Sequence, residues 1–482
     1  MHKWLLLVAL MSPTVASAHA FIQPYKLPMP YWMYIYGAVA ALVLSFVVFG
    51  LLSDKTAAAA PRQLAFGDAR WLQVLRRFKL KPLAQALTLF LLLLSMVSGL
   101  LGNNDPSRNI NMTLFWVVFT LGFSYSVALL GDLYAILNPW QTMVRCLAKL
   151  SQRFETGTWQ YPSSLAYWPA FVLYLGFIWV ELLGNTRPFS LSVYLWVYTA
   201  ITLLGCLAWG RRAWFAYADF FAVFLRLVSL CAPIHYQPDA TGAARWSLSW
   251  PFQRLVNAKP VDLSLLLFVL FMLSSTAFDG LRETKQWFAW FWLDPTGLLQ
   301  AWLGKPPVYA YVTLRPWYMA YEVVILLLSP LLYLGAFALF LALGKRLIKT
   351  WASTMQLVYQ FALSLLPIAL VYHVTHYYTL LLTQGVKIRA LISDPFGWQW
   401  DLFGTAYTLR MPIIPDMGNV WYSQVGLILF GHVASVYIAH KQALSSFGRQ
   451  RYAFLSQLPM LLLMVLFTAF GLWILAQPLQ GR

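Results

Sequence analysis

Charged side chains are scarce in this sequence. Asp, Glu, Lys and Arg together make up 10% of the 482 residues, whereas hydrophobic residues make up 60%, and the mean hydropathy is +0.63. A soluble globular protein of this length needs a polar surface that so few charges cannot supply. This scarcity excludes a water-soluble domain and predicts an integral membrane protein.

Several other features are absent. The apolar runs, each about twenty residues long, lack the period-2 alternation of barrel strands, so helices are expected to span the membrane. The three cysteines, Cys146, Cys206 and Cys231, have no C-x-x-C spacing, so neither a disulfide framework nor a thiolate metal site is indicated. The motifs H-E-x-x-H and G-x-S-x-G and the P-loop are also missing, which excludes the enzyme classes that depend on them.

Positive charge is in excess, with 34 Lys and Arg residues against 16 Asp and Glu residues. These cations lie in short connections between apolar runs and form no basic face with interleaved aromatic residues. We therefore expect no nucleic-acid partner. Positively charged connections instead mark the cytoplasmic side of a membrane protein. The first long connection, residues 53–82, is rich in Lys and Arg and is expected to be cytoplasmic.

The sequence predicts an all-α fold, a polytopic transmembrane helix bundle of about ten spans that has the lipid bilayer as its main partner. The spans are expected at residues 31–52, 83–102, 110–130, 164–184, 190–209, 261–280, 318–343, 353–382, 421–440 and 453–476. One further apolar segment, residues 213–231, carries Asp219 and Arg226 in its middle. Because a charged centre is costly in lipid, we expect this segment to be an interfacial or half-buried amphipathic helix.

The N-terminus is typical of a secretory signal peptide, residues 1–18, with a basic start, an apolar core and an A-x-A site that ends at Ala18. Residues 19–482 then form a single transmembrane domain in a bacterial inner membrane, with both mature ends in the periplasm. Cleavage after Ala18 makes His19 the first residue, and cleavage after Ala20 is the alternative. A terminal His19 is able to chelate a metal through its α-amine and Nδ1, or it merely lies in the cleavage region.

Three histidines fall within predicted spans, in the half expected to face the periplasm. His373 and His376 are three residues apart and share a helix face, and His432 lies on the next span. Neutral imidazoles with carboxylates suit Zn, Cu, Fe or Mn, so we predict a divalent metal ion bound by His373, His376 and His432, with His19 as a further ligand. Structural hydrogen bonds between helices and a proton path are the alternatives.

Three carboxylates are expected near the same side of the membrane. Asp279 ends one span, Glu322 lies one turn inside the next, and Asp394 belongs to the loop between the histidine-bearing spans. We predict catalytic roles for these three residues. His235 and His440, by contrast, are expected to be surface histidines.

Two long outer loops, residues 281–317 and 383–420, carry many of the aromatic residues, which make up 17% of the chain. Tryptophan and tyrosine gather at membrane interfaces, so an aromatic belt is one interpretation. The other is an apolar vestibule that receives a lipophilic small-molecule substrate.

Several segments together resemble a known family. They are His19-Ala20-Phe21, Tyr25-Lys26-Leu27-Pro28-Met29-Pro30, Phe278-Asp279-Gly280, Tyr372-His373-Val374-Thr375-His376-Tyr377, Ser393-Asp394-Pro395-Phe396-Gly397, Gly431-His432-Val433 and Ala439-His440. In combination they are similar to bacterial integral membrane proteins described as fenitrothion hydrolase-like. The resemblance implies hydrolysis of an aryl organothiophosphate ester with release of a nitrophenol, and it assigns no catalytic residue.

The sequence thus leads to three functional hypotheses. The first is a membrane-embedded, metal-dependent hydrolase of the phosphotriester type, in which the metal polarises a phosphoryl oxygen and activates water and a carboxylate acts as general base. The second is a transporter or metal-handling membrane protein that uses the same residues. The third is a non-catalytic subunit or assembly factor of a membrane complex.

Overall fold

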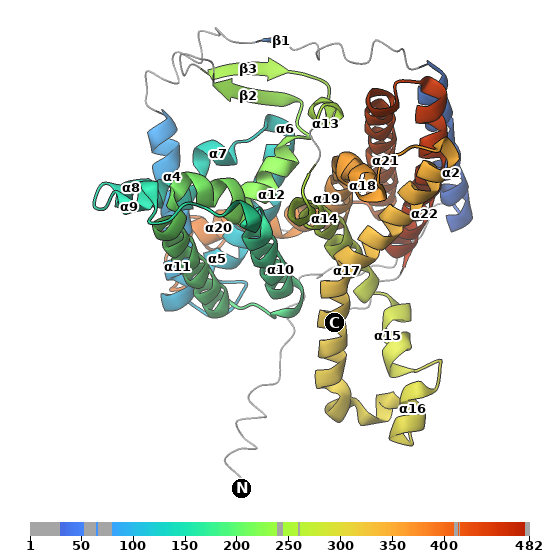
Figure 1. Ribbon diagram of the computed structural model, residues 1–482. Coiled ribbons are helices and arrows are strands. Elements are labelled where there is room, and N and C mark those ends of the chain that lie inside the picture. The colour runs from blue at the N-terminus through green and yellow to red at the C-terminus, as the bar shows by residue number, and fades with distance from the viewer. Residues whose placement is uncertain are drawn as a thin grey trace.

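A computed structural model describes residues 29–52, 64–65, 80–238, 244–258, 261–408, 413 and 415–477. The predicted signal peptide, residues 1–18, and both His19 and Ala20 lie outside the described residues. Within these described ranges, ten helical stretches are long and apolar enough to cross a membrane, and they correspond in order to the ten predicted spans. The structure confirms an all-α bundle suited to a lipid bilayer (Figure 1).

The long helices are α2 (Tyr31–Leu52), α4 (Leu80–Leu101), α10 (Trp168–Leu183), α11 (Pro188–Ala213), α14 (Leu263–Arg282), α17 (Tyr311–Ile348), α19 (Leu366–Gln384), α21 (Met417–Phe447) and α22 (Gln450–Ala476). One further span is a continuous stretch of α5 (Ile110–Met112), η1 (Thr113–Phe123) and α6 (Ser124–Leu130). The shorter helices are α7 (Tyr134–Leu137), α8 (Pro139–Ala148), α9 (Arg153–Thr156), η2 (Ser163–Leu165), η3 (Trp214–Ala218), α12 (Phe220–Ser229), α13 (Gln253–Val256), α15 (Lys285–Trp292), α16 (Leu298–Leu303), η4 (Pro307–Ala310), α18 (Thr354–Phe361), η5 (Ala362–Leu365), η6 (Gly385–Lys387) and α20 (Ile388–Ser393).

Helix α14 is the centre of the bundle. It packs against α10, α17, α19 and α22, and 17 of its 20 residues are buried. A helix that is apolar on all sides must be covered on all sides by other helices or by lipid. In α14 protein provides the cover, which allows its last turn to carry charged side chains.

The first described helix closes the bundle against the last two. Helix α2 packs on α21 and α22, and the three lie together at the right of Figure 1. The Tyr31 hydroxyl donates to the carbonyl oxygen of Ala469 at 3.3 Å. At the other end of α2, Gln450 Nε2 donates to the carbonyl oxygen of Gly50 at 2.8 Å.

The segment expected at the interface lies inside the bundle instead. Seven of the ten residues of α12 are buried, none is exposed, and the helix packs against α6, α10 and α19. Asp219, at the start of α12, is fully buried and accepts a hydrogen bond at 2.7 Å from Tyr198, which lies in the middle of α11. The helical path of α11 breaks at Gly210, whose φ is 80°, and the chain then returns toward Tyr198 before α12 begins. We call α12 the re-entrant helix.

Local hydrogen bonds explain why this charged segment does not lie at a surface. Asp219 Oδ1 accepts from the backbone N–H of Ala222 at 2.7 Å and so caps the re-entrant helix. Arg226 Nη2 donates to the carbonyl oxygen of Ala216 at 2.7 Å. A buried charge is tolerated when it is paired or hydrogen-bonded, and irregular backbone is tolerated at membrane depth when protein surrounds it.

A small sheet lies at one end of the bundle. Strands β1 (Leu64–Ala65), β2 (Ile234–Pro238) and β3 (Ala244–Leu248) pair antiparallel in the order β1-β3-β2. His235 belongs to β2; it is 2% exposed, and its Nε2 lies 2.6 Å from Ser249 Oγ. Burial, with a contribution from Arg254, lowers the pKa of His235 to about 4. The expectation of a surface position was wrong for His235 and also for His440, which is 1% exposed within α21.

An outer arm projects from the opposite end of the bundle, where the sequence predicted a loop. It consists of α15, α16, η4 and the first turns of α17 (Figure 1). Its small core is formed by Trp292, Ala310 and Leu314. Trp287 is 2% exposed and stacks on Tyr321 with ring centroids 4.7 Å apart. Many of the aromatic residues of this region thus pack on one another.

Candidate functional site

The Asp279 carboxylate joins the two central helices. Asp279 lies in the last turn of α14 and is 1% exposed. Its Oδ2 lies 2.8 Å from His376 Nε2 and accepts a hydrogen bond at 2.8 Å from the Tyr377 hydroxyl, both from α19. The structure therefore brings together two predicted site residues, Asp279 and His376. It adds Tyr377, which sequence reasoning missed. We call these three residues the Asp279 cluster.

A buried arginine lies beside this cluster. Arg282 is 8% exposed, and its Nη2 lies 4.0 Å from Asp279 Oδ1 and 3.4 Å from Glu283 Oε1. Its Nη1 donates to the carbonyl oxygen of Leu182. This cation offsets part of the negative charge of the two carboxylates, so the cluster is not an isolated charge in an apolar medium.

A small cavity adjoins the cluster; most of its wall is apolar, and we call it the polar cavity after the polar side chains that also line it. Its polar lining comes from five helical elements and comprises Thr120, Ser124, Glu181, Ser275, Thr276, His373 and Tyr377. The centre of a water molecule can occupy about 20 Å³ of this polar cavity. A water needs roughly 10–15 Å³ measured in this way, so the polar cavity has room for about one water molecule. Glu181, a carboxylate that the sequence analysis did not select, faces this space.

A second, smaller cavity lies on the other side of His373. It is lined by Ser124, Tyr125, Phe224, Val228, Met272, Ala369, Leu370 and His373, and offers about 10 Å³ to a water centre. The Tyr125 hydroxyl lies 3.4 Å from His373 Nδ1 and 3.3 Å from the His373 carbonyl oxygen. Because Met272 and Ala369 lie one turn nearer the starts of α14 and α19 than Ser275 and His373, we call this space the inner cavity.

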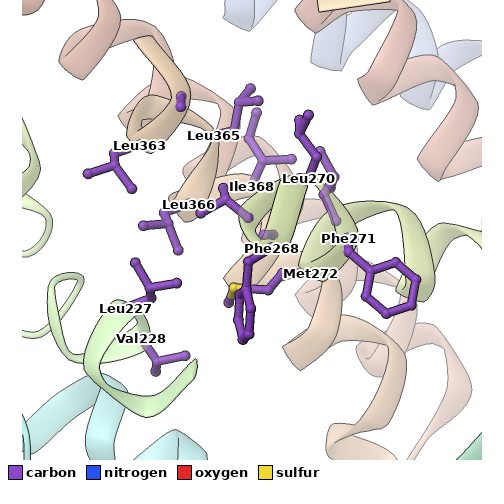
Figure 2. Packing of buried hydrophobic residues seen from close by; sticks show 14 of the residues in the cluster. Leu227, Val228, Phe268, Leu270, Phe271, Met272, Leu363, Leu365, Leu366 and Ile368 are labelled. Atoms are coloured by element: carbon purple, nitrogen blue, oxygen red, sulfur yellow. The ribbon is translucent and has the colours of Figure 1, made fainter. Parts of the chain in front are cut away.

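An apolar layer closes the bundle beyond the inner cavity. Figure 2 shows ten of its buried side chains, which come from the re-entrant helix, from α14, and from η5 with α19. They are Leu227, Val228, Phe268, Leu270, Phe271, Met272, Leu363, Leu365, Leu366 and Ile368, and each is at most 6% exposed. Val228 and Met272 also line the inner cavity, so the apolar layer begins where the inner cavity ends.

The wall of the polar cavity includes an unusual helix. Segment η1, which contributes Phe119 and Thr120, is π-helical over 11 residues. π-helical turns are rare and often occur at functional sites. Within η1 the Thr120 hydroxyl donates to the carbonyl oxygen of Phe115 at 3.0 Å, a bond that satisfies one backbone acceptor of this irregular segment.

The other predicted site residues have different surroundings. His432 is fully buried in α21, its Nδ1 lies 2.8 Å from the Ile428 carbonyl oxygen, and it lines neither cavity. The Asp394 carboxylate accepts from the backbone N–H groups of Trp398 and Gln399, both at 2.9 Å, and so shapes its own loop. Glu322 is 4% exposed within α17 and also lines neither cavity.

The donor set of the site does not match the predicted metal centre. Within the described part of the chain, no three His, Cys, Asp or Glu side chains stand close enough to hold one metal ion. His376 Nε2 is engaged with Asp279, and the Nδ1 of His432 is engaged with its own helix. The geometry offers a histidine–carboxylate pair with a phenol, which suits proton exchange better than metal ligation.

No family model, curated protein or solved structure matches this chain. The resemblance to fenitrothion hydrolase-like proteins therefore stays a prediction, and the function is inferred from the geometry of the Asp279 cluster and the two cavities.

Proposed function

We propose that this protein is a proton-coupled transporter of the bacterial inner membrane, with Asp279 as its proton-binding residue. One observation carries the proposal. A buried carboxylate on the central helix α14 accepts hydrogen bonds from two side chains of α19. Ionisable groups inside membrane spans are costly and mark ion or proton paths by default.

Protonation of this carboxylate changes how α14 and α19 hold together. As a carboxylate, Asp279 accepts from His376 and Tyr377 with one oxygen. As a neutral acid it keeps one donor and weaker acceptors, because charge-assisted hydrogen bonds are roughly twice as strong as neutral ones. Loading a proton therefore weakens the link between the two central helices, which is how proton binding drives a change of conformation.

The surrounding helices support the same proposal. The re-entrant helix and the π-helical η1 both line the polar cavity, and irregular helices at membrane depth occur where they line a cavity and are frequent at functional sites. The polar cavity has room for only about one water molecule. In our proposal this conformation is closed, and a solute enters when the helices around the Asp279 cluster move apart.

Proton uptake by reconstituted vesicles tests the proposal. An internal pH-sensitive dye reports acidification when a potassium diffusion potential, set with valinomycin, drives protons inward. A panel of amino acids, sugars, organophosphates and divalent cations is then added outside to find the coupled solute. We expect acidification with the native protein, and at least about a tenfold slower rate for Asp279→Asn, since the amide cannot exchange a proton.

The matched control is Asp394→Asn, which alters a hydrogen-bonded carboxylate that lines neither cavity. This variant should acidify vesicles as the native protein does. Equal rates for the native protein and Asp279→Asn, with both proteins folded, would refute the proposal.

The orientation is part of the proposal. It places the polar cavity on the periplasmic side, because Lys345, Arg346 and Lys349 end α17 on the opposite side. Reporter fusions after Lys305 should report periplasm, and fusions after Lys349 should report cytoplasm. The reverse result would place the polar cavity on the cytoplasmic side and reverse the direction of the proposed proton path.

Hydrolysis of an aryl phosphotriester is the second candidate function. His376 contacts Asp279 at 2.8 Å, an arrangement in which a carboxylate orients a histidine general base. Release of a nitrophenol from a chromogenic aryl phosphotriester, measured with and without added Zn²⁺, tests it. Turnover that disappears in His376→Gln would favour the enzyme, whereas no turnover above that of empty micelles would exclude this substrate class.

A further inference from the structure

The His373 side chain separates the two cavities. The polar cavity and the inner cavity share His373, Ser124 and Phe224 in their linings. Tyr377, one turn further along α19, lines only the polar cavity, and Ala369, one turn earlier, lines only the inner cavity. An imidazole thus stands at the boundary between two spaces that follow one another along the same pair of helices.

Both cavities are close to the size of one water molecule and have mostly apolar walls with a few polar groups beside this imidazole. The larger offers about 20 Å³ and the smaller about 10 Å³ to a water centre, near the minimum of roughly 10–15 Å³. A buried water also needs two to four polar partners. Ser124, Tyr125 and His373 supply them in the inner cavity, and Glu181 and Thr276 contribute on the outer side.

The groups around His373 favour proton exchange over tight ion pairing. The titratable side chains near the ring are Tyr125 of α6, Tyr174 and Glu181 of α10, and His376 and Tyr377 of its own helix. The re-entrant helix contributes the apolar ring of Phe224, with centroids 6.3 Å apart. α14 contributes Ser275, Thr276 and Met272 to the two cavities. Among these described groups, none is a lysine or arginine.

We propose that His373 is the relay that passes protons between the polar cavity and the inner cavity. The inference rests on the proposed function and names the path inward from the Asp279 cluster. A proton from the outer side binds one ring nitrogen, and the proton on the other nitrogen leaves toward the inner cavity. The ring then carries its proton on the opposite nitrogen and must rotate before the next transfer, so protons and charge balance in each cycle.

The apolar layer sets where this transfer stops. The ten buried apolar side chains of this layer, of which Val228 and Met272 line the inner cavity, provide no hydrogen-bonding side chain (Figure 2). In this conformation the relay therefore delivers protons to the inner cavity and no further. Passage onward requires Leu227 and Val228 of the re-entrant helix to separate from α14 and η5.

A pair of buried histidines provides a matched test. His373→Gln removes an imidazole between the cavities, whereas His432→Gln removes a fully buried imidazole that lines neither. Two readouts are taken in the same vesicles. Isotope-edited infrared difference spectra follow protonation of the Asp279 carboxyl group, and the internal dye follows proton entry.

We expect His373→Gln to slow proton entry at least about tenfold while the Asp279 carboxyl band still titrates. His432→Gln should keep both signals. Normal proton entry in His373→Gln would overturn the relay. Loss of the Asp279 titration in the native protein itself would instead refute the proposed function, so the two failures are distinguishable.

A second variant guards against a purely structural effect. His373→Ala enlarges the space between the cavities, and added free imidazole should restore part of its proton entry. If folded His373→Ala regains thermal stability in the presence of imidazole but does not regain proton entry, His373 is assigned to packing and the relay is rejected.

Discussion

Helices α14 and α17 pack against each other, yet they meet different surroundings. In α14, 89% of the apolar window is buried inside the protein, whereas in the stretch that contains α17 only 22% is buried. The last turns of α14 carry Ser275, Thr276 and Asp279. Helix α17 instead exposes aliphatic side chains such as Leu327 and Leu332.

The difference shows where a membrane protein can keep chemistry. A charged or strongly polar side chain that faces lipid loses its hydrogen bonds, and the cost is several kcal/mol. A helix wrapped by other helices can replace those bonds, as Asp279 does with His376 and Tyr377. Proton chemistry is therefore expected on α14 and α19, and anchoring in lipid on α17.

Truncation of a large side chain should give the largest difference between the two helices in the free energy of unfolding. Phe268→Ala on α14 leaves a cavity at a fully buried position, and we expect the free energy of unfolding to fall by about 3–5 kcal/mol. Leu332→Ala on α17, at a side chain 62% exposed, should change it by less than about 1 kcal/mol. Unfolding by SDS titration in mixed micelles measures both. Equal losses would mean that α17 is also enclosed, by a second copy or a partner.

Added volume should give a smaller difference in stability between an enclosed position, here on α22, and an exposed position on α17. A Cβ at Gly471 of α22 would overlap the Tyr372 hydroxyl of α19, so Gly471→Ala should lower the free energy of unfolding by about 1–3 kcal/mol. A Cβ at Gly335 of α17 would meet none of the described atoms within 4 Å. Gly335→Ala should therefore be neutral or slightly stabilising in the same SDS titration, since alanine favours a helix by up to about 1 kcal/mol. A destabilised Gly335→Ala would break the comparison.

A pH dependence extends the comparison to a buried group outside the spans. His235 keeps its neutral form when folded, with a pKa of about 4, and binds a proton near pH 6.5 when unfolded. The unfolded state therefore gains protons first, so stability is complete above about pH 6.5 and falls as the pH drops toward 4. We expect a loss on the order of 1–2 kcal/mol over this window, and a flatter profile for His235→Gln. Thermal unfolding at several pH values, compared between the two proteins, measures it.

The smallest effect is expected for a single hydroxyl. Tyr377→Phe removes one hydrogen bond to Asp279 and should lower the free energy of unfolding by about 1 kcal/mol while slowing proton entry less than Asp279→Asn does. Tyr333→Phe on α17 is the control, because no hydrogen bond from its hydroxyl to the described residues is seen and its ring stacks on Phe467. Indistinguishable proton entry in the native protein and Tyr377→Phe would remove Tyr377 from the proton path.

The sequence was sufficient for the spans and for part of the site. Runs of apolar residues and cationic connections located all ten helices, because length and hydropathy act locally along the chain. The depth of Asp279 and His376 was also a local property, and these two residues do meet. Their partner Tyr377 was not predicted, because tyrosine is common in spans and the sequence does not show that α14 lies opposite α19 at this position.

The rest depended on contacts between distant segments. Asp219 suggested a surface helix, since nothing in the sequence pairs it with Tyr198 in the middle of α11. His235 was expected at the surface because the pairing of its strand β2 with β3 leaves no clear signal in short segments. His432 shares its approximate depth with His373, but the face that it presents is fixed by the packing of α21 on α19.

The contact between α2 and the last two helices has a consequence for biogenesis. The hydrogen bond from Tyr31 to Ala469 joins residues 438 positions apart, and ribosomes add about 5–20 residues per second, so α2 waits on the order of 20–90 s for its partner. Its buried stripe, Tyr34, Ala38, Leu42 and Phe46, is solvated by lipid or held by the insertion machinery during that time. A nascent chain arrested before α21 therefore presents an unfinished helix, open to quality control.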